Sequence, residues 1–112
     1  MTAYVGVDIG TGGVRAVALN EELTPEYSCS RSYAVTSPEP GWAEQDPDEI
    51  VSKTVSVMEE MADRHEDVVF CLSSVMHSIL AVDGSGDPVS PLLIWADNRA
   101  IRETKWLERE YG

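Results

Sequence analysis

The first part of the chain alternates between apolar runs and short polar breaks, a pattern typical of β-strands joined by tight turns. Tyr4–Ile9 is apolar apart from Gly6 and Asp8, which predicts a strand that is buried on both faces. Val14–Leu19 is a second apolar run, and only four residues separate it from the first. Because a parallel pair needs a long crossover, the two runs are expected to pair antiparallel.

A third strand is predicted over Tyr27–Thr36, where apolar and polar positions alternate and Thr24-Pro25 supplies the preceding turn. One face of this strand is expected to carry Tyr27, Cys29, Tyr33 and Val35. The other face is expected to carry Ser28, Ser30, Ser32 and Thr36. Such a strand has one face in water and the other against a core.

The stretch SPEPGWAEQDP is predicted to be a loop that ends in a helix start signal. Asp46 can cap the helix, Pro47 suits its first position, and Glu49 completes a capping-box pattern. The helix that follows has one apolar stripe, formed by Ile50, Thr54, Val57, Met58 and Met61. We expect this stripe to pack into the core.

The residue pattern in the second half of the chain predicts three short strands and a last helix. Val68–Leu72 is β-branched and apolar and predicts a buried strand, while Ile79–Val82 and Leu92–Trp95 flank the polar turn DGSGDP as two further strands. Asp97–Tyr111 is charged and amphipathic, with Asp97 as a candidate cap. Its inward face is expected to comprise Ile101, Thr104, Leu107 and Tyr111.

The predicted order of elements is therefore β-β-β-α-β-(β-β)-α. Strands joined by short turns and then strands alternating with helices predict an α/β fold, a mixed sheet with helices on its faces. With 112 residues, the chain is one domain or part of one.

The charge of the chain is strongly acidic, with 20 Asp and Glu against 8 Lys and Arg and a net charge of -12. Because nucleic acid and anionic membranes attract cationic surfaces, neither is an expected partner. The acidity fits a protein kept soluble in high salt, and ordinary solubility explains it as well. Without metal-ligand spacing, Cys29 and Cys71 are expected to be reduced small hydrophobes in an intracellular protein.

The glycine-rich turn between the first two strands is the first candidate site. Gly10 and Gly12 let backbone N–H groups approach an anion closely, and Thr11 and Arg15 add a hydroxyl and a cation. Asp8 offers a hard oxygen ligand of the kind that suits Mg2+. The alternative is an ordinary hairpin in which Asp8 only hydrogen-bonds the turn.

Two further stretches carry candidate binding residues. His77 follows a predicted strand, where ligands gather in open α/β sheets, although a lone histidine is more often structural. Trp95 can cover a sugar face, while Asp97 and Arg99 can hydrogen-bond hydroxyls or a carboxylate. The alternative assigns Trp95 to the core, Asp97 to the helix cap and Arg99 to a surface ion pair.

Taken together, these motifs resemble the N-terminal part of the FGGY-family carbohydrate kinases over nearly the whole chain. The stretches YVGVDIGTGGVRAVALN, PEPGWAEQDPDEI and SSVMHSILAVDGSGDPVSPLLIWADNRA occur in that order and at similar spacings. The glycine loop alone would indicate only the wider superfamily of actin, Hsp70 and sugar-kinase ATPases. The GWAEQDP loop and the W-x-D-x-R junction narrow the resemblance to the FGGY kinases.

The resemblance implies an actin-like ATPase (ribonuclease H-like) domain that binds ATP and Mg2+. The loop with Gly10 and Gly12 is similar to the first phosphate-binding hairpin of the family. Asp8 would orient Mg2+ through water, and Thr11 and Arg15 would face the ATP phosphates. Many members have Thr or Ser where Gly12 stands, so one hydroxyl contact to phosphate is expected to be missing.

The resemblance also implies a sugar site. Met76 and His77 match the Met-His pair that touches the sugar in xylulose kinases, and Trp95, Asp97 and Arg99 match the wall of the sugar pocket. The sequences SSVMHS and WADNRA are similar to the gluconate-kinase branch, whose substrate carries a carboxylate that Arg99 could meet. The implied partners are a small-molecule sugar or sugar acid and, for the full-length enzyme, a second copy of itself in a homodimer. The implied location is the cytoplasm.

No acid in the chain matches the general-base Asp of the family. Residues 1–112 are therefore expected to be the N-terminal part of FGGY kinase domain I, without the catalytic-base segment and the second domain. On this hypothesis the fragment folds but does not turn over. The competing interpretations are a non-catalytic actin- or Hsp70-like ATPase module and an acidic interaction domain.

Overall fold

The computed structural model describes all 112 residues, which divide into two compact units. The first unit comprises Met1–Ala34 and Asp46–Met76, and the second comprises Val35–Gln45 and His77–Gly112. Neither helix of the structure has the combination of length and apolar character that crossing a membrane requires.

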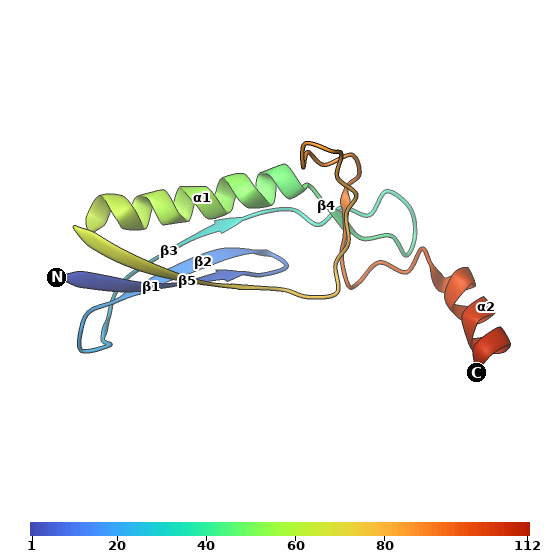
Figure 1. Cartoon of the computed structure of the whole chain (residues 1–112), viewed down its shortest axis with the longest axis horizontal. Helices are drawn as coiled ribbons and strands as arrows, with labels where there is room; N and C mark the ends of the chain where they lie inside the picture. Colours follow the sequence, from blue (N-terminus) through green and yellow to red (C-terminus); the bar gives the residue numbers. More distant parts are fainter. The chain divides into compact units, whose positions relative to one another are not determined.

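The first unit is a four-stranded mixed sheet with one helix along it (Figure 1). Its strands are β1 (Thr2–Ile9), β2 (Gly13–Leu19), β3 (Pro25–Ser32) and β5 (Asp67–Ser74), in the order β3-β2-β1-β5. β1 pairs antiparallel with β2 and parallel with β5, and β2 pairs antiparallel with β3. The predicted mixed sheet and antiparallel first hairpin are confirmed.

Helix α1 (Pro47–Arg64) begins where the sequence predicts. The Asp46 carboxylate accepts hydrogen bonds from the backbone N–H groups of Asp48 (2.9 Å) and Glu49 (3.4 Å), two donors that the first turn leaves without helical partners. The predicted stripe is confirmed: Thr54, Val57 and Met61 are buried, and Ile50 and Met58 are half-buried against the same core.

The core of this unit lies on one face of the sheet only. Ala3, Val5 and Val7 of β1 are buried, whereas Tyr4 and Asp8 are exposed. The prediction that this first strand is buried on both faces is wrong, because α1 covers a single face within this chain. The strand predicted over Val68–Leu72 is confirmed as part of β5, but its predicted burial is wrong for a related reason. β5 lies at the edge of the sheet, and half of its Val69 and Leu72 surface is exposed.

The third strand is shorter than predicted at its end. β3 ends at Ser32, and Thr36 instead pairs with Glu44 in the second unit. Tyr33 remains buried as expected, whereas Val35 is exposed. Both cysteines are free; Cys29 is half-buried, whereas Cys71 is exposed on the open face of β5.

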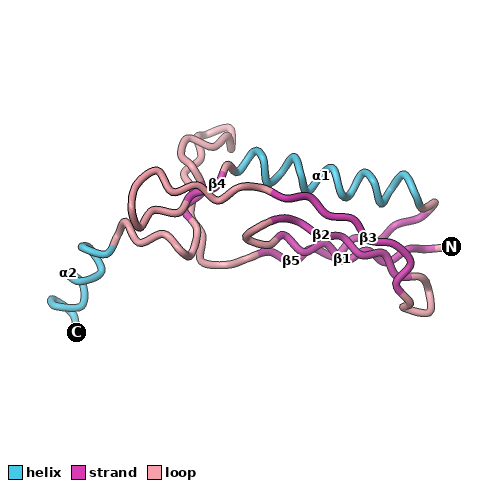
Figure 2. The backbone as a smooth tube through the Cα atoms, turned by 180° about the vertical axis from the view of Figure 1, so that it is seen from behind, coloured by secondary structure: helices cyan, strands magenta, loops and turns pink.

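The second unit is mostly loop around a small ladder (Figure 2). β4 (Glu44–Gln45) pairs antiparallel with β6 (Leu92–Leu93). The strand predicted at Ile79–Val82 is reduced to isolated bridges, and the strand predicted at Leu92–Trp95 is reduced to the two residues of β6. The pairing of β4 within the predicted loop was not expected from the sequence.

Helix α2 (Ile101–Tyr111) begins four residues later than predicted. Ala100 is at its N-terminus and makes no side-chain cap, so the prediction that Asp97 caps this helix is wrong. The four residues expected to face inward are all exposed, because α2 makes no extensive contact with another helix or strand: Ile101, Thr104, Leu107 and Tyr111.

Candidate functional site

The glycine turn between β1 and β2 is closed by its own backbone and held by Tyr33. The Gly10 N–H donates to the Gly13 carbonyl at 2.9 Å. This N–H therefore closes the hairpin and does not contribute to the predicted nest of phosphate donors. The Tyr33 hydroxyl donates to the Gly10 carbonyl, and the Tyr33 N–H donates to the Gly12 carbonyl at 3.3 Å.

The glycines of this turn differ in how much space surrounds them. A Cβ atom at Gly13 would lie 2.4 Å from the Arg31 carbonyl oxygen, so only glycine allows β2 and β3 to approach here. A Cβ at Gly12 would meet nothing within 4 Å. Gly12 is therefore open toward any ligand of the turn, with space for a side chain.

Next to the turn, one polar side chain from each strand lies in a row across the open face of the sheet. Asp8 is in register with Arg15 on one side and with Ser73 on the other, and Arg15 is in register with Ser30. All four residues are exposed. No ion pair joins Asp8 to Arg15, although they are cross-strand neighbours. We call these four residues the polar row.

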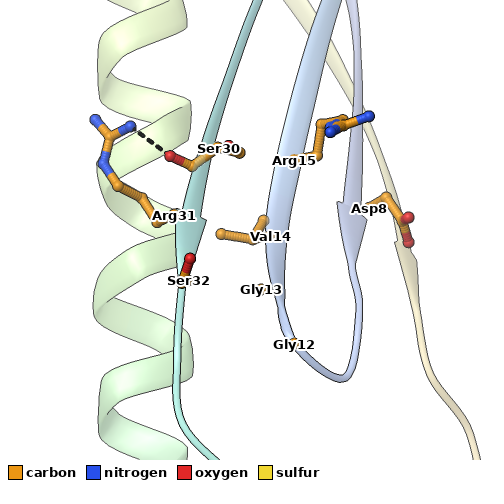
Figure 3. Close-up of a pocket in the computed structure, with 8 residues that line it drawn as sticks. All are labelled: Asp8, Gly12, Gly13, Val14, Arg15, Ser30, Arg31 and Ser32. Carbon is orange, nitrogen blue, oxygen red and sulfur yellow. Dashed lines mark hydrogen bonds between the residues drawn. The ribbon is translucent and has the colours of Figure 1, made fainter.

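The polar row borders a cavity of about 300 Å³ at the hairpin (Figure 3). Arg31, on the neighbouring strand, is on the side of helix α1 and pairs with Glu60 at 2.6 Å. The cavity is lined by Asp8, Gly12, Gly13, Val14, Arg15, Ser30, Arg31 and Ser32. It combines an uncommitted guanidinium and hydroxyl groups, which suit an anion, with one carboxylate, which suits a cation.

The structure contains no cluster of three or more His, Cys, Asp or Glu side chains placed to hold a metal. Asp8 is a single exposed carboxylate beside the glycine turn. Mg2+ in phosphate-transfer sites typically keeps several waters and uses one or two carboxylates together with substrate phosphates. The donor set around Asp8 fits that mode of binding.

In the second unit, a different Asp–Arg pair is fully engaged. The Asp97 carboxylate accepts hydrogen bonds from the Ala43 N–H (2.7 Å), the Arg99 N–H (3.0 Å) and Arg99 Nε (2.9 Å). Arg99 Nη2 also pairs with Glu44 at 2.7 Å, and its guanidinium lies 3.9 Å from the centre of the Trp42 ring. This cluster joins the GWAEQ stretch to the WADNR stretch and is called the Asp97 cluster below.

The electrostatics of this cluster follow from its hydrogen bonds. The bond from Arg99, with further help from the Ala43 N–H, lowers the pKa of Asp97 from 3.8 to about 2. The same bond to Asp97, and the one to Glu44, raise the pKa of Arg99. Both side chains therefore stay charged over the working range of pH.

The remaining candidate residues are exposed. Trp95 is 61% exposed, which contradicts its assignment to the core. Met76 ends the first unit and is 70% exposed. His77 begins the second unit, is also exposed, and has a backbone φ of 64°. A non-glycine residue in this left-handed region is uncommon and is found disproportionately at functional sites.

Sequence reasoning missed the role of several residues in these two regions. Tyr33 was expected only as a core residue, and its hydroxyl contact with the glycine turn has no sequence signal. Ser30 and Ser73 could be placed beside Arg15 and Asp8 only once the register of all four strands is known. Glu44 lies in a segment predicted to be loop, and its pairing with Arg99 joins residues 55 positions apart.

Comparison with solved structures identifies the class of fold. The chain superposes on the ligand-bound xylulose kinase from Lactobacillus acidophilus with a TM-score of 0.91 and 22% sequence identity, covering 97% of this chain and 23% of that one. Such sugar kinases have the actin-like ATPase fold, which is the fold of this chain.

The family follows from the sequence match. Residues 3–112 match the N-terminal domain of the FGGY family of carbohydrate kinases, and the chain belongs to this family. It is 36% identical over 105 residues to a gluconokinase from Bacillus licheniformis, covering 89% of this chain and 20% of the relative. It is 32% identical over 108 residues to the xylulose kinase of Escherichia coli strain K12, covering 94% of this chain and 22% of the relative. The chain thus spans about a fifth of the length of these relatives.

Proposed function

We propose that the chain is the N-terminal part of domain I of an ATP-dependent sugar kinase. The complete enzyme transfers the γ-phosphoryl group of ATP to a hydroxyl of a sugar or sugar acid of the xylulose or gluconate type. The observation that carries this proposal is the polar row beside the glycine turn. Arg15 and Asp8 are cross-strand neighbours without an ion pair in a chain of the FGGY family, and this supports the proposal that they meet a phosphate and its metal.

The reaction needs charge neutralisation more than covalent chemistry by the protein. The sugar hydroxyl oxygen forms a bond to the γ-phosphorus, the bond from that phosphorus to the bridging oxygen of ADP breaks, and the hydroxyl proton passes to a general base. Mg2+, when bound, neutralises charge on the phosphates. In this chain, Asp8 would hold the metal through water, while Thr11 and Arg15 would bind phosphate oxygens.

The sugar side of the proposal rests on exposed residues of the chain. Met76 and His77 would contact the sugar, and the exposed Trp95 ring would cover one of its faces. Asp97 and Arg99 would form the pocket wall. Arg99 borders a cavity of about 290 Å³ with Ile79, Leu93 and their neighbours, so it can both hold Asp97 and face a substrate carboxylate.

The general base and the second nucleotide-binding domain are proposed to lie in residues outside this chain. The polar row offers Asp8 alone as a carboxylate, and we assign that residue to the metal. The isolated chain is therefore expected to fold and to bind its ligands weakly without turnover.

The test is ADP release by the complete protein that contains this chain, with ATP, Mg2+ and either xylulose, gluconate or glycerol. We expect release that requires both ATP and one of the sugars. No release and no calorimetric binding with any polyol or sugar acid would favour the non-catalytic actin- or Hsp70-like interpretation. Sugar-dependent turnover by residues 1–112 alone would show that the general base lies within this chain and not outside it.

A further inference from the structure

Tyr33 occupies an unusual position for a core tyrosine. Its ring is buried, with 6% of the residue exposed, directly after β3. Its two hydrogen bonds go to two carbonyl groups of the same turn, from its hydroxyl to Gly10 and from its N–H to Gly12. A single residue just past the end of β3 therefore holds both sides of the β1–β2 turn.

These contacts set the direction of the N–H groups in the turn. A peptide unit is planar and trans, so its carbonyl and the N–H of the next residue point in opposite directions. Holding the Gly10 carbonyl therefore fixes the direction of the Thr11 N–H, and holding the Gly12 carbonyl fixes that of the Gly13 N–H. Glycine-rich backbone has many accessible conformations, so without these contacts the turn would sample other directions.

We propose that Tyr33 is a positioning residue that fixes the glycine turn in the shape that binds the nucleotide phosphates. This inference rests on the proposed function. Burial, with a smaller effect of the nearby Asp8 charge, raises the pKa of Tyr33, so its hydroxyl remains a donor throughout the neutral and mildly alkaline range.

Tyr27 lies in β3, the strand that Tyr33 directly follows, and provides a matched control. Its hydroxyl also donates a hydrogen bond, to Glu60 of helix α1, and its ring is half-buried against the same core. Removing either hydroxyl deletes one oxygen atom and one hydrogen bond. Only the Tyr33 hydroxyl contacts the glycine turn.

The experiment compares Tyr33→Phe with Tyr27→Phe in the complete protein. We expect Tyr33→Phe to raise the KM and the Kd for ATP about three- to tenfold, the range of one lost hydrogen bond, with an unchanged KM for the sugar. Hydrogen exchange of residues 9–13 should become faster in the same variant. Tyr27→Phe should change none of these values, even if its melting temperature falls as much as that of Tyr33→Phe.

The outcomes separate this inference from the proposed function. A wild-type protein without sugar-dependent ADP release overturns both. An active wild-type protein in which the two variants have equal ATP affinity and equal exchange at residues 9–13 overturns the role of Tyr33 and leaves the proposed function standing. If Tyr33→Phe lowers the affinities for ATP and sugar equally, its role is general stability and the positioning role is wrong.

Discussion

The two units each contain an aspartate and an arginine that are close in sequence, and only one of the two pairs forms an ion pair. Asp8 and Arg15 are cross-strand neighbours on the open face of the sheet, and no ion pair joins them. Asp97 and Arg99 are two residues apart and bind each other, with further hydrogen bonds to Ala43 and Glu44. From the sequence, both pairs were candidates for ligand contact.

The difference indicates which charges are available to a ligand. A carboxylate that already accepts several hydrogen bonds gains little from another donor, and releasing its partners costs free energy. The Asp97 cluster therefore acts first on the fold, by joining the segments around residues 43 and 97. No ion pair holds Asp8 or Arg15, so both charges remain available for the phosphate and metal of the proposed function.

The largest expected effect comes from removing the carboxylate of the polar row. Asp8→Ala in the complete protein should lower kcat about 10²- to 10³-fold, the range for losing one electrostatic contact to the transition state, with the sugar Kd nearly unchanged. Steady-state ADP release and calorimetry with the sugar measure the two quantities. A lost sugar affinity with normal kcat would place Asp8 outside the metal side of the site.

For the stability of the fold, we expect the larger effect at Asp97 and the smaller one at Asp8. Asp97→Asn should lower the urea midpoint of unfolding several times more than Asp8→Asn, because the first change weakens a network of hydrogen bonds and the second changes an exposed group. Trp42, Trp95 and Trp106 all lie in the second unit, so tryptophan fluorescence reports on that unit and circular dichroism on the whole chain. Equal shifts for the two variants would mean that the Asp97 cluster does not stabilise the fold.

Low pH should weaken the Asp97 cluster. The pKa of Asp97 falls from 3.8 to about 2 on folding, so its stabilising effect is complete above about pH 4 and is lost as the pH falls toward 2. Part of the acid sensitivity of the second unit should therefore disappear in Asp97→Asn. An acid titration followed by tryptophan fluorescence checks this, and a variant with the wild-type profile would contradict it.

The sequence predicted the elements that depend on local pattern and failed where a missing neighbour decides burial. The hairpin, the Asp46 cap and the buried stripe of α1 are local features and are confirmed. The predicted two-sided burial of β1 and the inward face of α2 each require a second layer that this chain does not contain. The glycine turn and its charged neighbours could be predicted from the sequence as a candidate site. The role of Tyr33 could not, because its contact depends on β3 lying beside the turn.

The smallest expected effect tests whether the turn can gain a ligand contact. Gly12 has open space around the position of a Cβ atom, so Gly12→Ser should fold normally, with a stability change within about 0.5 kcal/mol. Its hydroxyl would supply the phosphate contact that the family resemblance predicts to be missing at this position, and we expect the ATP Kd of the complete protein to fall two- to fivefold, the range of a modest hydrogen bond. Gly13→Ser is the matched control, because its Cβ would meet the Arg31 carbonyl oxygen and the variant should lose stability without gaining affinity. An unchanged ATP affinity in a stable Gly12→Ser would show that the open side of the turn does not face the phosphates. The contrast between the polar row and the Asp97 cluster would then no longer indicate where phosphate binds.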